Sequence, residues 1–97
     1  MELKKTAMAG TLESGDVQVK LAPGQGGMSV TVDSVVINQY GRRIKEVAKE
    51  TLAALGVASA ELSLVDKGAL DCTIRARVEC AAYRAAEVQA VAWKGGA

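Results

Sequence analysis

The sequence has 97 residues, 49% of them hydrophobic, which is enough for one compact domain but not for two independent cores. Its 12 Lys and Arg residues nearly balance its 11 Asp and Glu residues, so no strong net charge is present to attract nucleic acid or an anionic membrane surface. There is no His, which excludes the nucleophilic sites that need an imidazole as their base; if the chain takes part in chemistry, we expect the reactive group to come from elsewhere.

The absence of long apolar segments argues against a membrane-spanning protein, and the placement of the cysteines argues against a disulfide-bonded or metal-binding one. The apolar runs are only a few residues long, far short of the ~20 needed to cross a bilayer. Residues 1–5 carry charges and no apolar segment follows them, so we expect no secretory signal and a cytoplasmic location. Cys72 and Cys80 do not form a C-x-x-C pair, so neither a disulfide scaffold nor a metal site is expected. Both cysteines are predicted to be small core residues.

The first third of the chain has the alternation of apolar and polar residues that is typical of half-buried strands. This period predicts strands at Val17–Leu21 and at Met28–Val32, and a shorter strand within residues 6–12. Residues 13–16 would then form the turn into the Val17 strand, because Gly accepts positive φ and Asp bonds to nearby backbone. Ser14 is therefore predicted to lie at an exposed tip.

A helix is predicted after the second of these strands, with Asp33 as its N-cap. Gly56 is expected to end it. Gly41, inside the helix, costs about 1 kcal/mol relative to Ala, so we expect a close packing contact at that position. The apolar stripe of this helix contains Val36, Tyr40, Ile44, Val47, Thr51 and Leu55.

The second half of the chain allows two interpretations. Residues 60–65 alternate as a strand, and Asp66, Lys67 and Gly68 supply turn chemistry. Residues 70–79 then alternate as the second strand of a β-hairpin, but the same stretch also fits a helical stripe. Residues 80–90 are predicted to be helical in either case, and residues 93–97 to be a flexible tail. The helical stripe would run through Leu70, Ile74, Val78 and Ala82.

These segments together predict a single α+β domain over residues 1–97. It would contain N-terminal β-strands, a central helix, a second β-hairpin or a strand-helix unit, and a C-terminal helix.

Function is indicated by two motifs in this order. The segment at residues 9–17 reads AGTLESGDV and leads into a strand, and the segment at residues 65–72 reads VDKGALDC and is followed by RARVE at residues 75–79. Together they closely resemble the citrate lyase gamma subunit family, which is the acyl carrier protein of that enzyme. The resemblance extends from about Ala7 to Trp93. The chain is similar, more distantly, to the carrier subunit of malonate decarboxylase, which shares a Ser-Gly-Asp turn before a strand.

The resemblance implies a non-catalytic carrier subunit of a lyase complex. Ser14 matches the serine that holds phosphoribosyl dephospho-CoA, a coenzyme-A-like prosthetic group, through a phosphodiester, with Gly15 and Asp16 in the flanking turn. The thiol of that group would carry acetyl and citryl thioesters while the alpha and beta subunits convert citrate to oxaloacetate and acetate. A dedicated transferase would attach the group, and neither nucleic acid nor a membrane is implied as a partner.

Two other functions stay open, the first from the more distant resemblance and the second from the residues alone. One is the carrier subunit of a malonate decarboxylase-type complex, and the other is a small protein-interaction domain with an unmodified Ser14. Residues 66–71 are either a docking surface or a hairpin turn with solvated charges. Arg75 and Arg77 would share one face of a strand, where they either hold the phosphates of the arm or face solvent or another subunit.

Overall fold

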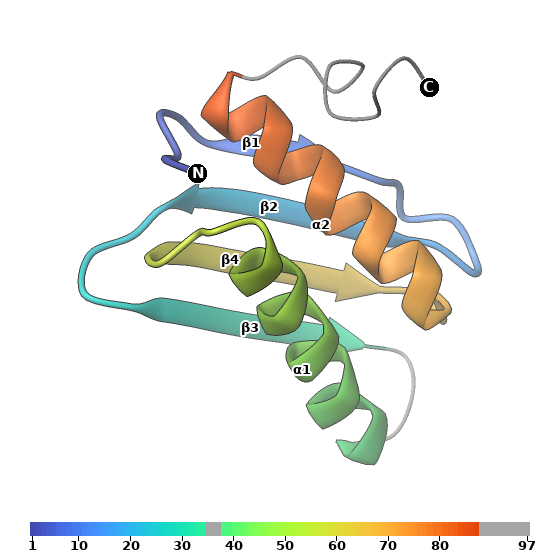
Figure 1. Ribbon diagram of the computed structural model, residues 1–97. Coiled ribbons are helices and arrows are strands. Elements are labelled where there is room, and N and C mark those ends of the chain that lie inside the picture. The colour runs from blue at the N-terminus through green and yellow to red at the C-terminus, as the bar shows by residue number, and fades with distance from the viewer. Residues whose placement is uncertain (35–37, 88–97) are drawn as a thin grey trace.

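The computed structural model of the protein describes residues 1–34 and 38–87, with the side chains of residues 38–40 outside the description. In chain order the elements are β1 (Ala7–Ala9), β2 (Val17–Pro23), β3 (Met28–Ser34), α1 (Asn38–Ala54), β4 (Ala60–Asp66) and α2 (Asp71–Ala86). The strands form one sheet and both helices cover the same face of it (Figure 1). The predicted α+β class is therefore confirmed.

The sheet is mixed, with the strand order β1-β2-β4-β3. β2 is antiparallel to both β1 and β4, whereas β3 and β4 are parallel and are joined through α1, as a parallel connection requires. The register places Val17, the first residue of β2, opposite Asp66, the last residue of β4. The loop before β2 and the loop after β4 therefore lie next to each other at one end of the molecule, on the right in Figure 1.

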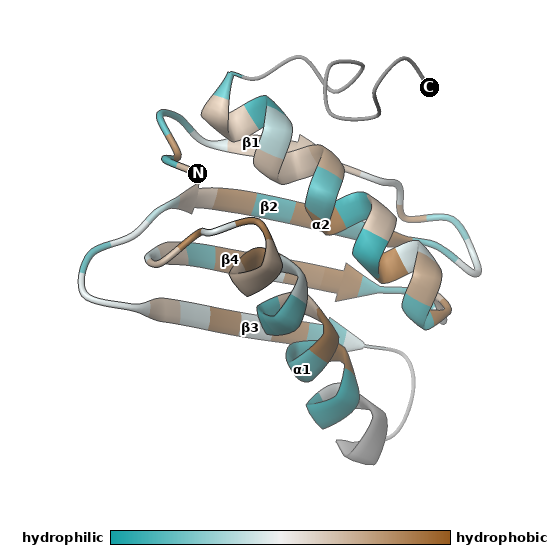
Figure 2. Ribbon diagram, viewed as in Figure 1, coloured by the Kyte–Doolittle hydropathy of each residue, from teal (hydrophilic) through white to brown (hydrophobic). Residues whose placement is uncertain are grey.

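The core lies between the sheet and the two helices. Apolar and polar residues alternate along much of β2 and β4 (Figure 2), and alternate positions from Val17 to Leu21 and from Ala60 to Asp66 are buried, on the face that the helices cover. Each buried Leu, Ile or Val contributes about 1.5–3 kcal/mol relative to exposure. The buried aliphatic side chains of the sheet are Val17, Val19, Leu21, Leu62 and Leu64, and those of the helices include Ile44, Val47, Leu52, Ile74 and Val78.

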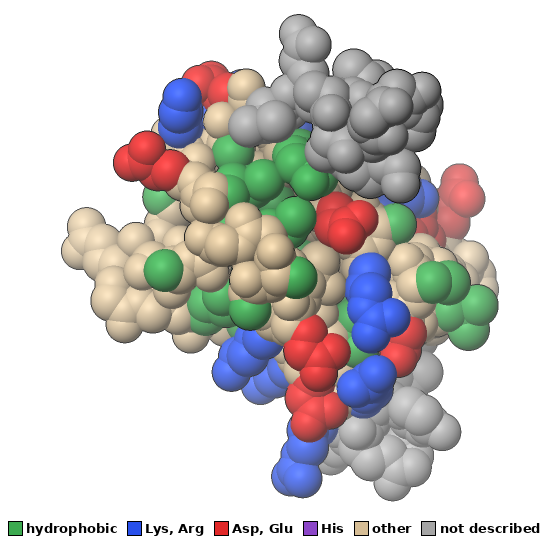
Figure 3. Space-filling view, in the orientation of Figure 1, with side chains coloured by type: hydrophobic (Ala, Val, Ile, Leu, Met, Phe, Trp, Pro, Cys, Tyr) green, Lys and Arg blue, Asp and Glu red, His purple; other side chains and the backbone are tan. Residues whose placement is uncertain are grey.

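The solvent side of the helices is charged, with acidic and basic side chains interspersed (Figure 3). Arg43 lies 3.7 Å from Glu46, and Arg75 lies 3.9 Å from Glu50. Neither α1 nor α2, the helices within the described residues, has the length and apolar character needed to cross a membrane.

α1 begins later than predicted. β3 continues through Asp33, whose backbone is paired in register with Val65, so the predicted N-cap role of Asp33 is wrong. Pairing with β4 satisfies the backbone there, and this outweighs the capping signal. The described residues also show no close contact at Gly41, contrary to the prediction, because a Cβ added there would meet no atom of another described segment within 4 Å.

The apolar stripe of α1 is confirmed where the structure describes it. Ile44, Val47 and Thr51 are buried, and Leu55 packs against the core. Gly56, with φ of +77°, follows the end of the helix as predicted. Val36 and the side chain of Tyr40 lie outside the described residues.

The helical interpretation of residues 70–79 is confirmed, and the second strand of the β-hairpin is wrong. Ile74, Val78 and Ala82 are buried in α2, although Leu70, just before the helix, is 71% exposed. The reason is topological. β2 and β3 already pair with the two edges of β4, so no edge remains for a hairpin partner.

The helix also changes the expected positions of several side chains. Arg75 and Arg77 do not share a face, because residues two apart on a helix point about 200° away from each other. Cys72 is exposed, which corrects its predicted core position, whereas Cys80 is partly buried against the core. The predicted helix over residues 80–90 is confirmed only as far as Ala86, because Glu87 adopts a left-handed conformation with φ of +62° that ends α2. Residues 88–90 and the predicted tail at residues 93–97 lie outside the described residues.

Candidate functional site

Ser14 lies in the loop that joins β1 to β2, which we call the serine loop (residues 10–16). Its side chain is exposed, as predicted, and within the described parts of the chain it makes no hydrogen bond. Gly15 has φ of +86°, and a Cβ added there would meet nothing within 4 Å. The hydroxyl therefore projects from a tight bend with open space beside it.

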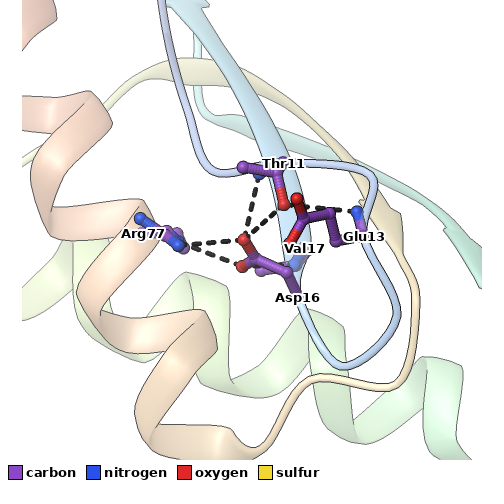
Figure 4. Close-up of polar contacts among 5 residues, drawn as sticks. All are labelled: Thr11, Glu13, Asp16, Val17 and Arg77. Atoms are coloured by element: carbon purple, nitrogen blue, oxygen red, sulfur yellow. Dashed lines mark hydrogen bonds and ion pairs between the residues drawn. The ribbon is translucent and has the colours of Figure 1, made fainter.

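The Asp16 carboxylate closes the base of this loop (Figure 4). Its Oδ2 accepts hydrogen bonds from the Thr11 backbone N–H at 3.2 Å and from Thr11 Oγ1 at 2.7 Å, and its Oδ1 accepts one from the Val17 N–H at 2.7 Å. Thr11 Oγ1 in turn accepts from the Glu13 N–H at 3.2 Å. One carboxylate thus joins the two ends of the loop and leaves Ser14 outside this network.

A second anchor comes from α2. Arg77 donates from Nε to Asp16 Oδ1 at 3.0 Å and from Nη2 to Asp16 Oδ2 at 2.9 Å, a bidentate pair (Figure 4). This guanidinium, together with the bonds from Thr11 and Val17, holds the pKa of Asp16 well below its ordinary value, and the same pair raises the pKa of Arg77. Arg77 therefore holds the loop with Nε and Nη2, and these two groups are not available to bind a phosphate in a bidentate way.

A third anchor comes from the loop between β4 and α2 (residues 67–70). The Gly15 N–H donates to the Lys67 carbonyl at 2.7 Å, and the Lys67 N–H donates to the Asp16 carbonyl at 2.9 Å. These bonds extend the β2–β4 pairing beyond the strands, so that the residue next to Ser14 is tied to the body of the domain.

Asp66 shapes that neighbouring loop. It is 1% exposed, which corrects the prediction of a hairpin turn with solvated charges. Its Oδ2 accepts from Ser34 Oγ at 2.8 Å and its Oδ1 accepts from the Ala69 N–H at 2.9 Å. Asp66 therefore stabilises the bend that carries Lys67 toward the serine loop.

The arrangement presents the Ser14 hydroxyl without activating it. The chain has no His, and the carboxylate of Asp16 is fully occupied as a hydrogen-bond acceptor with a lowered pKa, which makes it a poor base. Among the described residues no cluster of three His, Cys, Asp or Glu side chains is placed to bind a metal ion. A serine in this setting is suited to modification by another protein.

The contacts that anchor the serine loop, made by Asp16, Arg77 and Lys67, differ in how far they can be predicted from the sequence. The turn role of Gly15 and Asp16 follows from their residue types. The sequence predicts that Arg77 holds phosphates or faces solvent or another subunit, and not that it pairs with Asp16, because the two residues are 61 positions apart and no local pattern connects them.

Comparison with known proteins agrees with the resemblance of the two motifs. Residues 4–85 match the protein family described as ACP, malonate decarboxylase delta subunit. The citrate lyase acyl carrier protein of Pectobacterium carotovorum is 49% identical over 94 residues, covering 97% of this chain and 98% of the relative. That of Klebsiella pneumoniae is 50% identical over 94 residues (96% and 97%), and that of Streptococcus mutans is 48% identical over 95 residues (97% and 93%).

A solved structure shares the fold. A chain in the crystal structure of a Pseudomonas malonate decarboxylase hetero-tetramer in complex with malonate matches with a TM-score of 0.66 and 27% identity, covering 84% of each chain. The identity to the citrate lyase carriers is higher and extends over nearly the whole chain. From its sequence and its fold, this chain belongs to the citrate lyase acyl carrier protein family.

Proposed function

We propose that the chain is the acyl carrier subunit of a citrate lyase and that Ser14 is its point of attachment for phosphoribosyl dephospho-CoA. Membership of an acyl carrier family implies a covalently bound prosthetic group. The observation that carries the choice of residue is the exposed hydroxyl of Ser14, on a loop tied at its base by Asp16 and Arg77.

The residues around Ser14 fit a bulky phosphodiester. The transferase that forms the bond must reach the oxygen, and an exposed loop allows this. Gly15 has open space where a side chain would otherwise stand. The hydrogen bonds that hold the loop use the side chains of Thr11, Asp16 and Arg77 and backbone groups, so substitution of the Ser14 hydroxyl breaks none of them.

The groups that this chain contains indicate which steps it performs and which steps the other subunits perform. The bound group would supply a thiol on which an acyl group is carried as a thioester. Ser14 tethers that group, and a short flexible tether raises the effective concentration of the carried group at a partner's active site to the millimolar range. Because no base lies ready beside Ser14, we assign the acyl exchange and the cleavage of citrate to the alpha and beta subunits, and the loading of Ser14 to a dedicated transferase.

Two observations agree with this assignment. The solved structure that shares the fold is that of a malonate decarboxylase hetero-tetramer, which supports a role within a multi-subunit complex. The near balance of 12 basic and 11 acidic residues gives no reason to expect nucleic acid or a membrane as a partner. We place the complex in the cytoplasm.

The alternative, a carrier of malonate decarboxylase, is not favoured. The matching chain of that enzyme is only 27% identical to this one, whereas the citrate lyase carriers are 48–50% identical.

Mass spectrometry tests the site. We expect the chain co-expressed with its transferase to gain the mass of one phosphoribosyl dephospho-CoA group, located on the peptide that contains Ser14. Ser14→Ala should gain none and should melt within about 4 °C of the wild type, because an exposed side chain without hydrogen bonds contributes little to stability.

Ser63→Ala is a matched control, since Ser63 is exposed on the outer face of β4, and it should load normally. Combined with the alpha and beta subunits, the Ser14→Ala chain should support no citrate cleavage. A group attached to any other residue, or cleavage that survives Ser14→Ala, would show that the assignment is wrong.

A further inference from the structure

A cavity of about 210 Å³, partly open to solvent, lies between α1, the β4–α2 loop and the first turns of α2. Its apolar lining comes from Ile44, Ala69 and Ile74. Its polar lining comes from Arg43, Asp66 and Asp71. The role of Ser14 as a tether does not by itself require such a space.

The cavity opens close to Ser14. Gly68, one of its lining residues, directly follows Lys67, whose carbonyl accepts the 2.7 Å hydrogen bond from Gly15 N–H. Gly15 in turn directly follows Ser14 in the chain. Standard backbone dimensions then place the edge of the cavity within about 10 Å of the Ser14 backbone. A flexible arm attached to Ser14 can fold back over this distance.

The size of the cavity selects what can enter it. A volume of 210 Å³ corresponds to about seven water molecules at the liquid's share of about 30 Å³ each. An acetyl thioester with the short amine-bearing stem next to it has a similar number of non-hydrogen atoms. A nucleoside, or a citryl thioester with its stem, has about twice as many or more, so neither can be enclosed.

The charged side chains that line the cavity also favour a small, neutral group over an anionic one. Arg43 donates from Nε and Nη2 to Asp71 Oδ2 at 3.1 Å and 3.0 Å, and its pKa is raised mainly by that bond. The carboxylate of Asp66, which is buried, also lines the cavity. With two carboxylates and one guanidinium that is already paired, the lining opposes phosphates and the carboxylates of a citryl group. A neutral, partly apolar group meets no such penalty.

We propose that this cavity binds the acetyl end of the arm attached to Ser14 and shields the thioester from water while the carrier is between active sites. The larger and anionic citryl form is excluded and stays available to the partner subunit. This inference rests on the proposed function of Ser14 and adds a binding site for one of the two carried groups.

A variant that fills the cavity tests the inference. Ala69→Leu adds a side chain inside it and keeps the backbone N–H that bonds to Asp66. Ala53→Leu is the control, because Ala53 is exposed on α1 and does not line the cavity. Each chain is loaded by the transferase, acetylated on the arm thiol with a ¹³C-labelled acetyl group, and treated with hydroxylamine at fixed pH, with free acetyl-CoA as the reference.

We expect the wild type and Ala53→Leu to lose acetyl at least about fivefold more slowly than acetyl-CoA, which corresponds to a bound population of about 80%. Ala69→Leu should react at nearly the acetyl-CoA rate. In the wild type, the labelled methyl group should show nuclear Overhauser contacts to the methyl groups of Ile44 and Ile74. This second measurement does not depend on the folding of any variant.

The results that overturn the inference are distinct from those that overturn the function. A group mapped to Ser14, together with an unprotected acetyl thioester or with contacts from the adenine protons to Ile44 and Ile74 instead, refutes the cavity site alone. Equal protection in Ala69→Leu and the wild type also refutes it. A prosthetic group that is missing from Ser14 refutes both the proposed function and the cavity site.

Discussion

The serine loop contains two glycines, and replacing each with Ala would distinguish the cost of backbone strain from the cost of steric contact. Gly10 and Gly15 have nearly the same φ, +87° and +86°, in the left-handed region that side chains disfavour. Replacing either with Ala should therefore cost about the same backbone strain, about 1–2 kcal/mol. Any further difference between Gly10→Ala and Gly15→Ala must come from what the new methyl group touches.

The surroundings of the two methyl groups are very different. At Gly15 nothing lies within 4 Å, so strain is the whole expected cost. At Gly10 the methyl carbon would overlap the Val17 carbonyl oxygen and lie 3.3 Å from Arg77 Cδ. Val17 begins β2 and is paired with Asp66, so it cannot move freely. Overpacking of this kind adds about 1–3 kcal/mol, so Gly10→Ala should be destabilised by about 2–5 kcal/mol in total.

Thermal melts of the two variants, followed by circular dichroism beside the wild type, measure the difference. For a domain of this size 1 kcal/mol shifts the melting temperature by about 4–8 °C. Gly10→Ala should therefore melt at least about 4 °C below Gly15→Ala, and loading by the transferase should fall more in Gly10→Ala because its loop base is displaced. Equal melting temperatures for the two variants would refute the close approach of Gly10 to β2.

The remaining predictions concern acid stability, the core and α1. Because Arg77 lowers the pKa of Asp16 in the folded state, the ionised carboxylate stabilises the fold fully above the unfolded pKa of about 3.9, and this stabilisation is lost as the pH falls toward the lower folded pKa. The free energy of unfolding, measured in urea, should therefore fall less steeply below pH 4 for Asp16→Asn than for the wild type. Identical slopes for the two proteins would contradict this. Leu64→Ala should lose about 2–5 kcal/mol in urea unfolding, since Leu64 is 1% exposed, whereas the control Leu70→Ala, at a 71% exposed position, should change stability by less than about 0.5 kcal/mol. Gly41→Ala should raise stability by about 0.5–1 kcal/mol in the same assay, because the position is helical with open space around it, and a loss would indicate a contact there after all.

Local features of this protein could be read from the sequence. The alternation in β2, β3 and β4 identifies strands because successive side chains face opposite sides of a sheet, and the register then buries Val19 and Leu64 as expected. The exposed bend at Ser14 follows from Gly15 and Asp16, whose conformational freedom and hydrogen bonding act within a few residues. The resemblance of two short motifs was enough to identify the family.

Other features depend on contacts between residues far apart, and these could not be read locally. The alternation at residues 70–79 favours a hairpin strand and also fits a helix, and the helix forms because β2 and β3 occupy both edges of β4. Asp33 had the residue type of a cap but became part of β3 because β4 was beside it. The bond between Arg77 and Asp16 spans 61 positions and exists only because α2 packs across β2. Periodicity reports the environment averaged along one segment, whereas strand pairing and ion pairing depend on which segments meet. In this protein the pairing of β2 and β3 with β4 decided the first, and the packing of α2 across β2 decided the second.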